Sequence, residues 1–189
     1  MRLSAFAATL LIPLAAHAAE QKPAPAPLTT TQQLDKLFAD LAKADSEDDA
    51  SPIQTQIEVL FQQSGSPTVD LLMTRGQGAL QSGDTGTARK VFDSVTKLAP
   101  EFAEGWHMRA QLQSAAGDDT GALLSLQKTI ALNPREFNAL LALADMLDDY
   151  GDKKGALATY RKVQALDPQN DNAKRAVRKL SREVEGEKI

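Results

Sequence analysis

The sequence has no cysteine, and it is poor in histidine and in aromatic residues. Of its 189 residues, two are His and 5% are aromatic. The absence of Cys excludes disulfides, thiolate zinc or iron–sulfur sites and a cysteine nucleophile. With His17 and His107 as its two histidines, the chain also cannot form a histidine-rich metal centre. We therefore expect neither a cofactor nor a bound metal.

An excess of positive charge is also missing. Lys and Arg number 21 against 25 Asp and Glu, which gives a net charge of −4. A nucleic-acid binder needs clustered Lys and Arg to neutralise phosphates. The charge balance therefore argues against a nucleic-acid partner. The content of 42% hydrophobic residues indicates one globular domain.

Long hydrophobic runs are limited to one short stretch at the N-terminus. Residues 3–14 are mostly apolar, follow Arg2, and precede an Ala-x-Ala box at 16–18. This pattern predicts a signal peptide over 1–18, cut between Ala18 and Ala19, and hence a periplasmic protein. The run is shorter than the roughly 20 residues that span a bilayer, so we expect no stable membrane insertion after cleavage. An uncleaved anchor or a buried N-terminal helix is the alternative.

The segment that follows the predicted cut, 19–30, alternates Pro with small residues. Such a segment stays extended and enters neither a helix nor a core, so we expect a linker.

The strongest pattern in the chain is a repeat of 34 residues. A Gly-Asp pair recurs at this interval, followed each time by an Ala, a large apolar residue and a Pro. The columns are Gly83-Asp84, Gly117-Asp118 and Gly151-Asp152; Ala88, Ala122 and Ala156; Phe92, Leu126 and Tyr160; and Pro100, Pro134 and Pro168. This period predicts an array of helix–turn–helix units.

Each column has a physical role in such a unit. Gly adopts the left-handed conformation that ends a first helix, and the following Asp caps the second helix. The Ala lies where two helices cross closely, and a larger residue there would overpack. Pro cannot continue a helix and ends each copy.

These columns resemble the tetratricopeptide repeat (TPR), with Trp106 as the large residue of the middle copy. The structural positions of the resemblance are Gly83, Ala88, Pro100, Trp106, Gly117, Ala122, Pro134, Gly151, Ala156 and Pro168. The resemblance implies an all-α fold, a right-handed α-solenoid of antiparallel helix pairs. Its three repeats are 69–102, 103–136 and 137–170.

Amphipathic segments flank the repeats on both sides. Residues 31–68 look like a degenerate helix pair that extends the array. Its first helix would open at a Thr30–Gln33 capping box and its second at Ser51-Pro52, after an acidic turn over 43–50. Residues 171–189 carry a narrow apolar stripe, which predicts a C-terminal capping helix.

Motifs for chemistry are weak. Gly76-x-Gly78 lacks the third glycine and the preceding strand of a nucleotide-binding turn. The alternating acids of the 43–50 turn lack the Gly and closing Glu of a calcium loop. The sequence has no G-x-S-x-G nucleophile elbow whose Ser could act together with His107 in a hydrolase triad. We therefore expect no catalytic residue, and a protein that is not an enzyme.

By resemblance, the first helix of each repeat lines a groove that binds a partner. The positions carried over are Met73, Gln77, Leu80, His107, Gln111, Ser114, Leu141, Asp145 and Asp148. They lack the Lys, Arg and Asn with which chaperone-binding members of the family hold a terminal carboxylate. Together with Asp149, the last two favour a basic segment of the partner.

The chain is thus expected to be a non-catalytic interaction module, similar to small exported bacterial TPR proteins, that binds a peptide or helix of an envelope protein. Alternatives are a regulatory or accessory subunit of a cell-envelope enzyme or assembly complex, and self-assembly of the chain.

Overall fold

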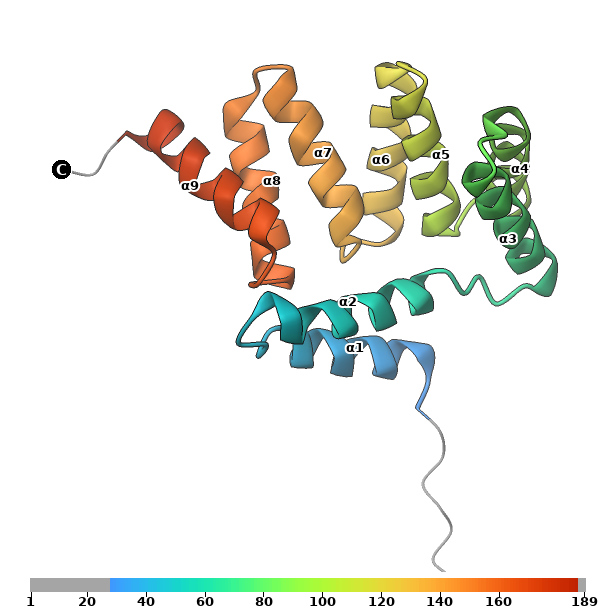
Figure 1. Ribbon diagram of the computed structural model, residues 1–189, viewed down its shortest axis with the longest axis horizontal. Helices are drawn as coiled ribbons and strands as arrows, with labels where there is room; N and C mark the ends of the chain where they lie inside the picture. The colour runs from blue at the N-terminus through green and yellow to red at the C-terminus, as the bar shows by residue number, and fades with distance from the viewer. Residues whose placement is uncertain (1–27, 187–189) are drawn as a thin grey trace, which may run out of the picture.

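The computed structural model describes residues 28–186, which contain nine α-helices and no β-strand (Figure 1). The helices are α1 (Thr30–Leu41), α2 (Glu47–Phe61), α3 (Pro67–Gln81), α4 (Thr85–Leu98), α5 (Ala103–Ala115), α6 (Asp119–Leu132), α7 (Phe137–Asp149), α8 (Lys153–Leu166) and α9 (Asp171–Glu185). The predicted signal peptide and most of the predicted linker lie outside these residues. Within 28–186, no helix combines the length and the apolar character needed to cross a membrane.

The Gly-Asp columns form the turns inside three antiparallel helix pairs, α3–α4, α5–α6 and α7–α8. Gly83, Gly117 and Gly151 have φ angles of +77°, +74° and +82°, the left-handed conformation predicted for them. The Asp after each of these glycines accepts a hydrogen bond from a backbone N–H in the first turn of the following helix, at 2.9–3.0 Å. The turn of each helix pair therefore contains the same two residue types, a Gly followed by an Asp.

Small residues let the paired helices approach closely. The Ala of each second helix is fully buried, at Ala88, Ala122 and Ala156. A Cβ atom added at Gly76 on α3 would lie 2.6 Å from the ring of Phe92 on α4, so only glycine fits there. The large apolar column, which includes Phe92, is also buried in all three copies.

Helix α9 closes the C-terminal end of the array. Its Ala173 and Leu180 are fully buried, and Val177 and Val184 pack against the same core cluster. This is the capping role that the apolar stripe predicted. The solenoid of helix pairs thus has a covered end at α9.

The N-terminal hairpin α1–α2 does not extend the array before α3. The expectation that this helix pair would extend the array is therefore wrong. The hairpin lies crosswise to the other helices, below α6–α8 in Figure 1. Its Phe38, Leu41 and Ile57 share one buried cluster with residues of α7, α8 and α9 such as Leu140. The buried residues packed around α3 and α4 come instead from α3, α4 and α5.

Both hairpin helices also begin earlier than the sequence predicted. The capping box is Thr29–Gln32 instead of Thr30–Gln33. Helix α2 begins at Glu47, capped by Ser46, so that Pro52 lies inside the helix. Acidic residues in the first turn of α2 favour this earlier start because they interact with the positive end of the helix dipole. Much of the predicted acidic turn is therefore helical.

Candidate functional site

An open cavity lies between α7 and α9, with Tyr160 of α8 at its base. Its volume is about 580 Å³. The lining residues are Asn138, Leu141, Ala142, Asp145, Tyr160, Asn172, Arg175, Ala176 and Lys179. Apolar side chains, two amides and charges of both signs thus meet in one groove, which we call the α7–α9 groove.

The acidic residues of this groove are already paired within the chain. Asp145 accepts a short hydrogen bond from the hydroxyl of Tyr160. Asp148 accepts from Lys153 Nζ at 2.7 Å and from Lys179 Nζ at 3.4 Å. The Lys153 bond lowers the pKa of Asp148, whereas burial and the Asp145 bond raise the pKa of Tyr160. The groove is therefore of mixed charge and not the acidic wall expected from the sequence.

The predicted groove residues fall into three groups. Leu141 and Asp145 line the α7–α9 groove, and Asp148 lies at its edge through its contact with Lys179. Gln111 and Ser114 are exposed on α5, and Gln77 and Leu80 are half-buried on α3. Met73 and His107 are only 3% and 5% exposed, so these two residues do not face an open groove.

The burial of His107 results from a polar cluster that the hairpin helps to cover. His107 Nδ1 lies 3.2 Å from Glu104 Oε2, one helical turn before it on α5. Its Nε2 lies 3.1 Å from the Gln111 amide nitrogen, one turn after it. Glu136, which precedes α7, and Glu58 of α2 line the same small cavity, whose volume is about 160 Å³. We call Glu104, His107 and Glu136 the buried triad.

Burial and mutual charge shift the protonation of the triad. Burial, together with the charge of Glu104, raises the pKa of Glu136 to about 8. Burial opposes protonation of His107, but the hydrogen bond and the charge of Glu104 outweigh it and raise the pKa of His107. Both groups therefore hold protons more tightly in the folded protein than in the unfolded chain.

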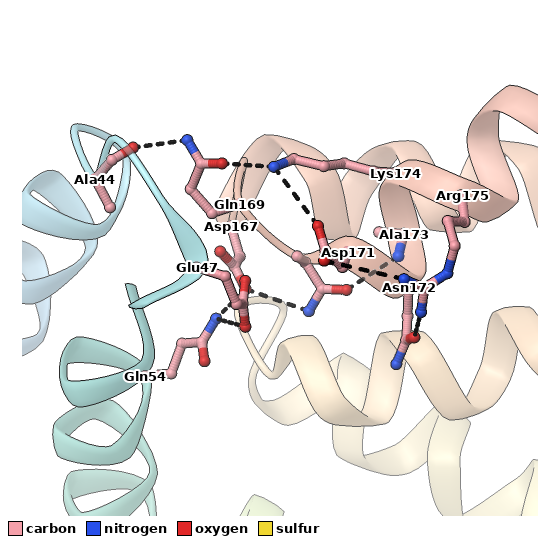
Figure 2. Close-up of polar contacts among 11 residues, drawn as sticks. Ala44, Glu47, Gln54, Asp167, Gln169, Asp171, Asn172, Ala173, Lys174 and Arg175 are labelled. Atoms are coloured by element: carbon pink, nitrogen blue, oxygen red, sulfur yellow. Dashed lines mark hydrogen bonds and ion pairs between the residues drawn. The ribbon is translucent and has the colours of Figure 1, made fainter. Parts of the chain in front are cut away.

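Polar contacts also attach the hairpin to the α8–α9 end of the array (Figure 2). Gln54 of α2 donates a 2.7 Å hydrogen bond to Asp167, and Gln169 donates a 2.8 Å bond to the carbonyl of Ala44. Asp167 is fully buried, and its Oδ1 has no hydrogen-bond partner among residues 28–186. Burial, opposed by a bond from Gln54, raises the pKa of nearby Glu47.

A second set of contacts holds the hairpin to the start of α7. The Arg135 guanidinium lies 2.7 Å from Asp35 and 4.5 Å from the centre of the Phe38 ring. Glu58 accepts a 2.8 Å hydrogen bond from the side-chain amide of Asn138. The hairpin is therefore anchored near the first turns of both α7 and α9.

Sequence reasoning missed the α9 wall of the groove and the partners of His107. Asn172, Arg175 and Lys179 recur at helical spacing on the polar side of α9, but the same spacing describes any solvated helix face. For the triad, the available signal was Glu104 three residues before His107, which places both on one helix face. Glu136 approaches His107 only because the start of α7 packs beside α5, and no local sequence pattern predicts that contact.

Comparison with known proteins identifies the repeat. The model of the tetratricopeptide repeat family matches residues 73–134 and 107–171, which together span more than half of the chain. A TPR repeat-containing protein of Rhizobium etli is 31% identical over 118 residues. That match covers 62% of this chain and 58% of the relative, so the chain spans somewhat more than half of that protein's length.

Solved TPR domains share the fold. The Arabidopsis OM64 TPR domain matches with a TM-score of 0.57 at 20% identity, covering 62% of this chain and 97% of the domain. The first TPR of Spaghetti (RPAP3), solved with an HSP90 peptide, matches with a TM-score of 0.57 at 19% identity, covering 62% and 93%. Taken with the family match, these findings show that the chain belongs to the tetratricopeptide repeat family.

Proposed function

We propose that this protein is an exported, non-catalytic interaction module that captures an extended peptide or a helix of a cell-envelope protein in the α7–α9 groove. The observation that carries the proposal is the open volume of about 580 Å³ between two helices of the array. A TPR domain of the same fold was solved with a bound peptide, which supports this mode of binding.

The chemistry of the groove suits a polypeptide backbone. Asn138 and Asn172 offer amides that can both donate to and accept from peptide groups. Leu141, Ala142 and Ala176 provide apolar contact between them. Because Asp148 is paired with lysines, we do not extend the proposal to a strongly basic partner. A segment of mixed charge complements Asp145 on one wall and Arg175 on the other.

The groove is tested by a double substitution that fills it from both walls. Asp145 and Asn172 are exposed, on α7 and α9. We expect Asp145→Lys with Asn172→Arg to reduce partner capture at least about tenfold, because long cationic side chains then occupy the peptide path. The measurement is photo-crosslinking in the native envelope from position 175, followed by mass spectrometry.

The matched control introduces the same two side chains, Lys and Arg, outside the groove. Asp45→Lys with Gln127→Arg places two cations at exposed positions, before α2 and on α6. We expect this control to capture the same partner as the original protein. Equal capture by both double variants would place the binding surface elsewhere. If the captured partner is an enzyme, the module is its regulatory or accessory subunit.

Export is tested separately by the mass of the mature chain. We expect the protein recovered from the periplasm to begin at Ala19, because signal peptidase cuts after an Ala-x-Ala box. Ala16→Leu with Ala18→Leu should leave the chain unprocessed, since both small residues of the box are then lost. A protein found in the cytoplasm with an intact N-terminus would contradict this part of the proposal.

A further inference from the structure

The buried triad lies between α5 and the start of α7, beside the hairpin. Glu104 and His107 come from the first turns of α5, and Glu136 from the residue that precedes α7. All three residues are buried, and one ligand-type atom from each lies within 4.8 Å of the other two. We propose that these side chains bind a divalent transition-metal ion of the Zn²⁺ type.

The donor set suits such an ion. Zn²⁺ binds imidazole nitrogen and carboxylate oxygen at about 2.0–2.2 Å, so two ligands of one tetrahedral ion lie about 3.4 Å apart. The His107 Nδ1 to Glu104 Oε2 distance is 3.2 Å. A Glu and a His three residues apart on one helix form a recurring metal-ligand pair in helical proteins. Mg²⁺ and Ca²⁺, which prefer oxygen ligands alone, fit this set less well.

The charges around the triad also favour the binding of a cation. Glu58, Glu104 and Glu136 all line the cavity, and no Lys or Arg is among the residues that enclose it in the described part of the chain. Carboxylates in a site of low dielectric repel one another unless they are protonated or neutralised. A divalent ion neutralises Glu104 and Glu136 and leaves the His107 imidazole neutral as a ligand.

The surroundings of the triad can orient the His107 imidazole and leave space beside the proposed ion. A metal on Nδ1 leaves the proton on Nε2 of His107, which lies 3.1 Å from the Gln111 amide nitrogen. Rotation of this amide by 180° presents its oxygen, which then accepts from Nε2 and fixes the orientation of the ligating imidazole. The cavity of about 160 Å³ has space for an ion with a water on its open side. Glu58 of α2 lines the same cavity, so the hairpin covers this side of the proposed site.

Metal binding is tested by calorimetric titration of chelator-treated full-length protein with ZnCl₂. We expect one ion per chain and a rise in the melting temperature on addition of Zn²⁺, with CaCl₂ producing no such rise. Glu136→Gln and His107→Gln should each weaken Zn²⁺ binding on the order of 100-fold, because each removes a ligand. Gln111→Met should weaken it about tenfold, because the ligating imidazole then loses the partner of its other ring nitrogen.

Glu136→Gln separates a lost ligand from a damaged fold. Gln has nearly the shape of protonated Glu, so the metal-free variant should keep the helical circular dichroism of the original protein while losing the Zn²⁺-dependent rise in melting temperature. Glu101→Gln is the matched control, since Glu101 is exposed and outside the triad, and it should bind Zn²⁺ normally. Failure of the original protein to bind Zn²⁺, or undiminished binding by Glu136→Gln, would overturn the proposal. Either result leaves the test of the α7–α9 groove unaffected.

Discussion

Metal-free protein should lose on the order of 3 kcal/mol of unfolding free energy between pH 5 and pH 7.5. Glu136 causes most of this loss. Its pKa is about 8 in the folded protein and near 4.5 in the unfolded chain, so the native state keeps a proton that the unfolded state releases. Stability from this group is fully present below about pH 4.5 and decreases as the pH rises towards 8. Each group of this kind contributes up to about 1.4 kcal/mol per pH unit.

Other titratable groups also affect how the unfolding free energy depends on pH, each in the direction that its pKa shift gives. His107 also has a raised pKa, so its contribution is complete below pH 6.5 and is lost as the pH rises through the folded value. Glu104 and Glu58 face the same cavity and supply the negative charge that favours both protons. Asp148, at the edge of the α7–α9 groove, has a lowered pKa and titrates below about 3.8. It therefore does not change the unfolding free energy between pH 5 and 7.5.

Urea denaturation at several pH values, in the presence of a chelator, measures this dependence. Gln at position 136 cannot ionise, so the unfolding free energy of Glu136→Gln should vary much less with pH and retain the parts due to His107 and Glu47. Saturating Zn²⁺ should reverse the trend in the original protein, because metal ligands must be deprotonated. A metal-free protein whose stability is constant or rises from pH 5 to 7.5 would contradict the assignment of Glu136.

The array was predictable from sequence because its determinants are local. The left-handed Gly83 and the capping Asp84 lie next to each other, and each acts on the helix ends beside it. Ala88 is buried against the helix that directly precedes its own in the chain. Three copies of the same pattern in phase then specify how one pair follows the next.

The position of the hairpin was not predictable because its contacts are distant in sequence. The amphipathic pattern over 31–68 predicts that each of the two helices buries one face. Phe38 and Ile57 are buried there, but periodicity does not specify which surface covers them. Their partners on α7–α9 lie roughly a hundred residues away, as the Asp35–Arg135 and Gln54–Asp167 contacts illustrate. A stacked fourth pair was therefore expected where the structure has a crossing one.

The candidate site was predicted in part for the same reason. Leu141 and Asp145 were assigned to the groove by their repeat positions, and they line it. His107 occupies an equivalent position but is buried, because Glu136 and Glu58 approach it from other elements. Pairing of Asp148 with Lys179 likewise requires α9 to pack beside α7, which the pattern of one repeat does not encode.

Ala122→Phe should destabilise the protein by about 3 kcal/mol, which corresponds to a fall in melting temperature of roughly 6–12 °C. Ala122 is fully buried on α6, which pairs with α5, and its column is small in all three repeats. Six additional heavy atoms there must push α5 and α6 apart and disturb their contacts with neighbouring pairs. Ala131→Phe, at an exposed position on the same helix, is the matched control and should change the melting temperature little. Equal melting curves for the two variants would show that the alanine column does not set the distance between paired helices.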